Sequence, residues 1–132
     1  MLVERELKLI SIDALIETEE YDHDHAINLA MNIKKHGMWT APIAIESSML
    51  TVMDGHHRLN AARFLGLARV PCLLMTYRSG GVVVKSWRDD IFCSVEGIRA
   101  MVENSQKYPI KTTRHLFNPP IRDIMIDLNL LY

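Results

Sequence analysis

The residues with the clearest chemical potential lie at a glycine between an apolar run and a helix-forming run. Asp54 and Gly55 end the apolar run, and three side chains able to contact an anion follow at once: His56, His57 and Arg58. A strand that enters a helix through a glycine turn leaves the first N–H groups of the helix unpaired, and such groups bind anions. An arginine near a helix start can hold a phosphate through two nitrogens. We interpret this stretch as a phosphate-binding bend, with a tight turn carrying solvated polar side chains as the alternative.

Two other polar stretches could contribute chemistry. Residues 17–22 are too acidic to be core, and residues 107–115 carry many hydrogen-bond donors. Each could also be a solvated loop, since acidic residues are common near a helix N-terminus. His23 and His25 lie two residues apart, which aligns them in an extended segment but not on a helix face. With no third ligand nearby, a helix N-cap at Asp22 or Asp24 is a simpler explanation than a metal site.

The elements that position these residues can be predicted from hydrophobic patterning and from capping residues. Helices are expected at residues 25–36 with Gly37 as C-cap, from the glycine bend to Leu65 with Gly66 ending it, and at residues 95–104 with Ser94 as N-cap. Strands are expected at residues 7–12, 43–46, 49–53, 70–75, 82–87 and 124–130, the second and third as a hairpin. This order predicts an α+β fold, in which helices pack against a small mixed β-sheet.

Size and composition limit the classes of protein to which this chain can belong. The chain has 132 residues, of which 48% are hydrophobic and 23% charged, so one domain with a single core is expected. The net charge of -1 gives no general attraction to DNA, and no DNA partner is expected. Cys72 and Cys93 have neither CxxC nor zinc spacing, which fits a reducing cytoplasm. Neither a signal-peptide pattern nor a membrane-spanning apolar run is seen, so no membrane partner is expected.

Several of these stretches together are similar to the ParB/sulfiredoxin superfamily. The similarity is carried by residues 7–12, 42–45, 53–58, 61–62, 65–66 and 70–71, and covers roughly residues 7–77. The Asp-Gly-His-His-Arg form at residues 54–58 looks most like the branch of free L-serine kinases, which phosphorylate the amino acid with a nucleotide. Partition proteins usually carry a Gly-Glu-Arg-Arg form there. Sulfiredoxins have a cysteine at the place of His56, so sulfiredoxin chemistry is not expected.

The resemblance implies one ParB/sulfiredoxin-like domain over residues 1–132, with a core at about 7–77 and a C-terminal extension at about 82–132. It implies that Glu17 is the catalytic base, and Glu19 and Glu20 would raise the pKa of Glu17 if they lie close to it. Asp54 would act on the nucleophile or hold Mg²⁺. The remaining implied site residues are Gly55, His56, His57 and Arg58 for the nucleotide phosphates, and Trp87, Lys111, Thr113 and His115 for the substrate.

The function implied by the resemblance is phosphoryl transfer from ATP or ADP, with Mg²⁺, to free L-serine or a similar amino acid. Two alternatives stand beside it. One is a non-catalytic regulator of the partition type, in which CTP or ATP biases a dimer or a DNA contact. The other is a domain that has kept the fold and lost the activity. The sequence leaves open whether the chain forms a homodimer and which nucleotide it binds.

Overall fold

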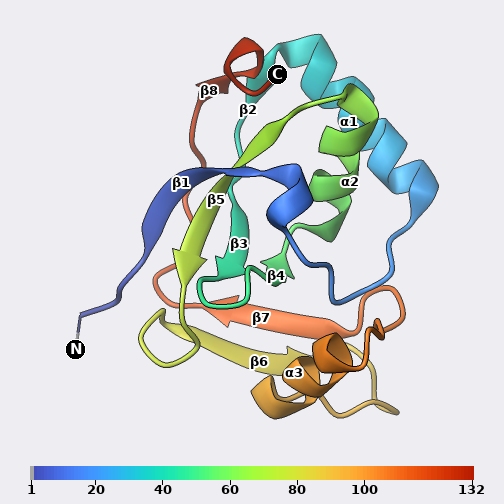
Figure 1. Ribbon diagram of the computed structural model, residues 1–132, viewed down its shortest axis with the longest axis vertical. Coiled ribbons are helices and arrows are strands. Elements are labelled where there is room, and N and C mark those ends of the chain that lie inside the picture. Colours follow the sequence, from blue (N-terminus) through green and yellow to red (C-terminus); the bar gives the residue numbers. More distant parts are fainter. Residues whose placement is uncertain (1) are drawn as a thin grey trace.

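The computed structural model describes residues 2–132, in which helices pack against a mixed sheet (Figure 1). The elements are β1 Glu6–Ser11, η1 Ile12–Ala14, α1 His23–His36, β2 Met38–Trp39, β3 Ile43–Glu46, β4 Val52–Asp54, α2 His56–Leu65, β5 Arg69–Met75, β6 Val82–Ser86, α3 Val95–Glu103, β7 Thr113–Phe117, β8 Ile126–Asp127 and η2 Leu128–Leu130. The α+β prediction is confirmed. Among these described helices, none has the length and apolar character that crossing a bilayer requires.

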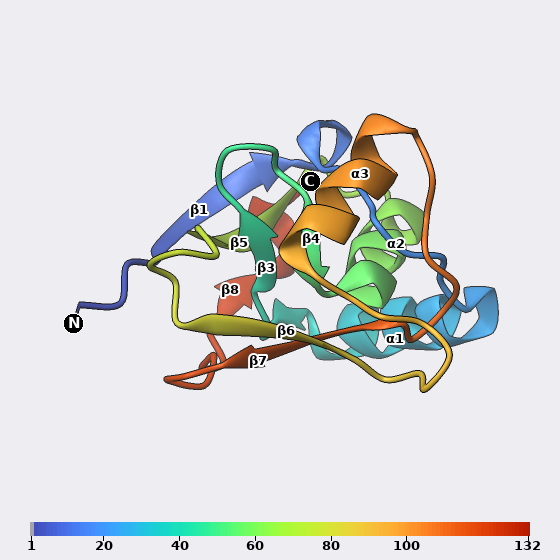
Figure 2. The same ribbon diagram turned by 90° about the horizontal axis from the view of Figure 1, so that it is seen from below.

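The main sheet has four strands in the order β1-β5-β3-β4. β3 runs parallel to β5, whereas β1 pairs with β5, and β4 with β3, in antiparallel directions. The chain must cross over between the parallel strands, and α2 lies in that connection. β6 and β7 form a separate antiparallel pair that crosses below the ends of β5, β3 and β4 in Figure 1, with α3 nearby (Figure 2). The residues of the predicted site therefore lie where the main sheet, α2 and the β6–β7 pair meet.

Local sequence explains where the helices begin and end. The Asp22 carboxylate accepts the backbone N–H of His25 at 3.2 Å and caps α1, which ends at Gly37 with φ 69°. The Ser94 hydroxyl accepts the N–H of Gly97 at 3.0 Å and caps α3. Short polar side chains satisfy the free N–H groups of a first turn, and glycine adopts the left-handed conformation of a helix end without strain. These capping predictions are confirmed.

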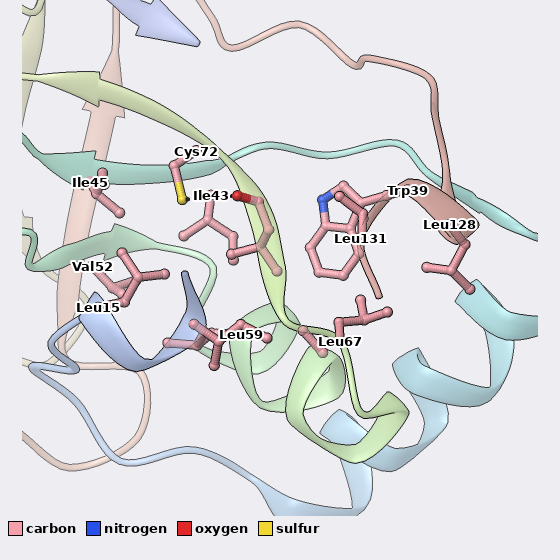
Figure 3. Packing of buried hydrophobic residues seen from close by; sticks show 13 residues of the cluster. Leu15, Trp39, Ile43, Ile45, Val52, Leu59, Leu67, Cys72, Leu128 and Leu131 are labelled. Carbon is pink, nitrogen blue, oxygen red and sulfur yellow. Dashed lines mark hydrogen bonds between the residues drawn. The ribbon is translucent and has the colours of Figure 1, made fainter. Parts of the chain in front are cut away.

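The core lies between the main sheet and α2. Figure 3 shows Ile43 and Val52 of the sheet close to Leu59 of α2, with Trp39 and Leu131 filling the far end. All five side chains are at most 2% exposed. A second, smaller cluster uses the alternate residues of the same strands and packs under β6 and β7. Burial on both faces of the central strands fixes α2, and so the bend before it, relative to the sheet.

Three expected elements differ from the structure. The polar stretch at residues 107–115, which the sequence suggests as a loop, runs into β7 at Thr113, because residues 113–117 pair with β6. The strand expected at residues 124–130 is reduced to β8, because the Asp127 carboxylate accepts the N–H of Asn129 at 2.9 Å and turns the chain into η2. The strand expected at residues 49–53 begins later, at Val52. In the hairpin before it, the Glu46 carboxylate holds the N–H groups of Ser48 and Met49 at 3.0 and 2.8 Å.

Candidate active site

The glycine bend has the geometry that the sequence predicts. β4 ends at Asp54, Gly55 has φ 115°, and α2 begins at His56. The first intrahelical bond is donated by Leu59 to the Gly55 carbonyl, so the N–H groups of the three residues between them have no intrahelical acceptor. A Cβ on Gly55 would lie 3.2 Å from the Ile43 side chain. Glycine is required here both for the backbone conformation and for the close packing on β3.

The bend opens into a cleft of about 420 Å³. We use "the cleft" for the space lined by Glu19, His25, Leu29, Met53, Asp54, Gly55, His56, His57, Arg58, Trp87, Lys111 and Thr113. Its cationic side chains are Arg58 and Lys111, and its carboxylates are Glu19 and Asp54. Within residues 2–132, no carboxylate forms an ion pair with Arg58. A helix N-terminus and two cations at one opening form an attractive place for an anion.

The two histidines of the bend hold the loop between η1 and α1. The Nε2 atom of His56 accepts the N–H of Thr18 at 3.1 Å, and the Nε2 atom of His57 accepts the N–H of Asp22 at 2.9 Å. Both rings are therefore neutral in this arrangement and carry their proton on Nδ1. Since Nε2 accepts a backbone N–H in each ring, Nδ1–H is the ring donor left for the predicted contact with phosphate. The backbone N–H groups of the bend remain for an anion.

Burial lowers the pKa of His56 to about 4, with the charges of His57 and Lys107 acting in the same direction and that of Glu17 opposing them. The pKa of His57 is also lowered, first by burial and then by His25. An imidazole that must stay neutral to accept a hydrogen bond keeps that bond only at pH values above its pKa. The contacts that hold the loop are thus sensitive to acid.

We expect the free energy of unfolding to fall as the pH drops from 6.5 towards 4. His56 stays neutral in the folded state and becomes protonated in the unfolded state, so its stabilising effect is present above pH 6.5 and is lost on acidification. Between pH 6.5 and 5, the loss from this residue is about 2 kcal/mol. Urea unfolding at several pH values measures it. His56→Gln keeps an acceptor without titrating and should flatten the profile, and an equally steep profile in this variant would contradict the assignment.

Glu19 brings a carboxylate into the cleft from the loop that the histidines hold. Its Oε1 atom accepts the N–H groups of Thr112 and Thr113 at 3.0 and 2.7 Å, and the Thr113 hydroxyl at 3.0 Å. The loop itself pairs with Tyr108, because Tyr108 donates its N–H to the Thr18 carbonyl at 2.9 Å. Within residues 2–132, no hydrogen bond engages the second oxygen, Oε2. Glu19 is therefore rigidly held, with one carboxylate oxygen available.

Glu17, predicted from the resemblance as the base, does not line the cleft. Its carboxylate accepts a hydrogen bond from Asn60 at 2.5 Å and pairs with Arg63 at 3.2 Å and Lys107 at 3.5 Å. Burial raises the pKa of Glu17, but the Asn60 hydrogen bond and the two cations outweigh it, and the net shift is downward. The expectation that acidic neighbours raise this pKa is wrong. Glu17 joins the loop to α2 and to the segment before Tyr108.

The extension after β5 contributes three of the four expected substrate residues. Trp87, Lys111 and Thr113 line the cleft, and the Arg114 guanidinium stacks 4.2 Å from the centre of the Trp87 ring. His115 lies behind the cleft instead, where its Nε2 atom is 2.9 Å from the Tyr77 hydroxyl. Burial lowers the pKa of His115 to about 4. The extension and the core thus build one site together, without His115 at its surface.

Sequence reasoning missed four residues of the cleft. The sequence suggests Glu19 only as a neighbour of Glu17, and His25 only as a metal ligand or a residue of the first turn of α1, whereas both line the cleft. Leu29 lies one turn after His25 on α1, and that spacing could have placed both on one face. Met53 immediately precedes Asp54. In the described part of the chain, no group of three or more His, Cys, Asp or Glu side chains could hold a metal ion by itself.

Both the sequence and the fold of this chain are similar to those of known proteins. The chain is 29% identical over 94 residues to an ATP-dependent L-serine kinase of Desulfurococcus mucosus, which covers 68% of this chain and 37% of that protein. It is 33% identical over 61 residues to a ParB-like protein of Sulfolobus acidocaldarius, covering 46% and 31%. A solved structure of a free serine kinase in complex with AMP superimposes with a TM-score of 0.84 and 15% identity, covering 100% of this chain and 95% of that chain. The chain has the ParB/sulfiredoxin-like fold.

This ParB/sulfiredoxin-like chain spans about a third of the length of the curated relatives that it matches. No protein-family model matches it. The resemblance to ParB-like proteins and to free serine kinases is confirmed by the relatives and by the superposition. The similarity to the solved kinase extends over β6, α3 and β7 as well as the core, so the extension after β5 is part of the shared fold.

Proposed function

We propose that this chain is an ATP-dependent kinase that phosphorylates free L-serine or a similar small amino acid. The observation that carries the proposal is that the N-terminus of α2 and the Glu19 carboxylate line one cleft. Phosphoryl transfer requires a held phosphate chain, neutralised charge and a base beside the attacking hydroxyl, and little else. Two curated relatives named ATP-dependent L-serine kinase support both the reaction and ATP as donor.

The nucleotide phosphates would bind at the glycine bend. The unpaired N–H groups at the start of α2 and the Arg58 guanidinium supply donors of the right charge. Asp54 is an exposed carboxylate at the same opening, and a single carboxylate together with phosphate oxygens is a common way to hold Mg²⁺. Mg²⁺ bound there would neutralise charge on the phosphates. Solved structures of free serine kinases with AMP and with ADP support an adenine nucleotide.

The amino acid would bind on the side of the cleft formed by the extension. Lys111 is exposed there and would pair with the carboxylate of the substrate, while Trp87 would cover its side chain. The substrate hydroxyl would then lie between Glu19 and the phosphates. Its oxygen attacks the γ-phosphorus, and a new O–P bond forms as the bond to the β–γ bridging oxygen breaks. Glu19 Oε2 takes the hydroxyl proton, and ADP leaves.

The domain assignment follows from the same arrangement. The core, at about residues 7–77, contributes the bend and Glu19, and the extension, at about residues 82–132, contributes Trp87, Lys111 and Thr113. We therefore treat residues 1–132 as one domain, since neither part contains the proposed site alone.

The decisive experiment is detection of phosphorylated product by mass spectrometry after incubating the chain with Mg²⁺, a nucleotide and one amino acid. We expect O-phosphoserine from L-serine and ATP, and no product from L-alanine, which has no hydroxyl. ADP and CTP as donors, and L-threonine and L-homoserine as acceptors, define the specificity. Absence of product for every pair, together with CTP-selective binding and salt-dependent affinity for DNA, would contradict the kinase and favour a nucleotide-dependent regulator.

A further inference from the structure

β1 is an edge strand whose outer side is open. It pairs with β5 alone in the main sheet, and no other described segment hydrogen-bonds to the backbone of Leu7, Lys8 or Leu9. Leu7 and Leu9 are 48% and 46% exposed. In Figure 1, the first half of this strand extends at the left of the molecule, away from the helices. An exposed apolar edge is a template on which a further strand can pair, and proteins usually cover or shorten it.

The backbone of β1 presents its free groups on that open side. Glu4 and Ile12, at either end of the strand, donate their N–H groups to the carbonyls of Ser79 and Ala68, on the side where β5 lies. Because the direction of the backbone groups alternates along a strand, the even-numbered residues face β5. The N–H and C=O groups of Leu7 and Leu9 therefore point outwards, and they can form the hydrogen-bonded pairs of a new antiparallel ladder.

The side chains of β1 are self-complementary in charge about Leu7. Glu6 and Lys8 lie on either side of it, with side chains 66% and 53% exposed. If two copies of the strand pair antiparallel with Leu7 opposite Leu7, each Glu6 faces Lys8 of the second copy. A pairing centred on Glu6 or on Lys8 would instead place like charges opposite each other, which is unfavourable. The register centred on Leu7 uses outward-pointing backbone groups for its central pair, as would one centred on Leu9, but a Leu9 centre places Lys8 opposite Ile10 and forms no Glu6–Lys8 pair.

We propose that β1 is a homodimer interface, in which two copies pair antiparallel about a twofold axis at Leu7 and join their four-stranded sheets. The charge pattern indicates a second copy of this chain as the partner of β1. An isologous interface requires a surface that matches itself under a twofold rotation, and this strand does so. Leu7 pairs with its own copy at the centre, and the exposed leucines of both strands become partly covered. The pairing lies on the main sheet, outside the cleft.

Sedimentation equilibrium of the full chain over about 1 to 200 µM tests the interface. We expect a species of twice 15.1 kDa to form as the concentration rises. Glu6→Lys alone, or Lys8→Glu alone, turns both cross-strand pairs repulsive and should weaken dimerisation by at least about tenfold. The double variant Glu6→Lys/Lys8→Glu exchanges the charges and should restore dimerisation to within about threefold of the original. Leu7→Lys should give a monomer at every concentration.

Lys35→Glu, on the exposed surface of α1, changes the net charge as Lys8→Glu does and should leave the dimer intact. Circular dichroism melting confirms that each variant is folded. A wild-type chain that stays monomeric at all concentrations overturns the proposal. A dimer weakened by both single reversals and not restored by the double exchange also overturns it, because the Leu7 register requires the rescue. Activity is not used in this test, so its outcome is independent of the proposed kinase reaction.

Discussion

Replacing Glu19 by glutamine should lower kcat for serine phosphorylation by about 10³-fold while leaving the affinity for nucleotide nearly unchanged. The amide oxygen of glutamine can still accept the N–H groups of Thr112 and Thr113 that now bind Oε1, so the loop should keep its position. The amide nitrogen that replaces Oε2 cannot take a proton. The change therefore removes the proposed base without removing the contacts that hold its side chain. Steady-state kinetics and calorimetry with ADP separate the two effects.

Two neighbouring carboxylates provide matched controls for this variant. Glu20→Gln changes an exposed side chain whose residue contacts Tyr108 only through its backbone N–H, and it should keep wild-type kcat. Glu17→Gln removes the partner of Arg63 and Lys107 and should lower thermal stability, with a much smaller loss of kcat than Glu19→Gln. If Glu17→Gln instead abolishes turnover and Glu19→Gln retains it, the base has been assigned to the wrong residue.

Much of the fold could be predicted because its determinants are local. The caps of α1 and α3 depend on side chains within three residues of the helix start, Asp22 and Ser94, and the end of α1 depends on Gly37. The bend at Gly55 could be predicted in the same way, since a glycine between a strand and a helix indicates a tight turn. Helix ends and turns of this kind can be predicted from sequence because the residues that determine them lie at the end or turn itself.

The choice between Glu17 and Glu19 could not be made in this way. Both lie in one acidic run, and what separates them is contact with distant segments: Asn60, Arg63 and Lys107 bind the first, while Thr112 and Thr113 bind the second. The strand β7 was missed for a related reason, since its polar residues become a strand by pairing with β6. The residues of the cleft that come from long-range pairing are those that local patterns leave undetermined.

Gly55→Ala should weaken nucleotide binding by at least about tenfold and lower the free energy of unfolding by about 1 to 3 kcal/mol. The variant needs an alanine at φ 115°, and its Cβ would lie 3.2 Å from a fully buried Ile43 side chain on β3. Relief of both strains requires the start of α2 to move, and the N–H groups of the bend move with it.

Gly37→Ala is the matched control for this variant. Gly37 also has positive φ, but no atom lies within 4 Å of its added Cβ, and Gly37 does not line the cleft. It should lose a similar amount of stability from backbone strain and bind ADP normally, as calorimetry and urea unfolding can establish. Unchanged ADP affinity in Gly55→Ala, or an equal loss in both variants, would contradict a specific role of the bend in binding phosphate.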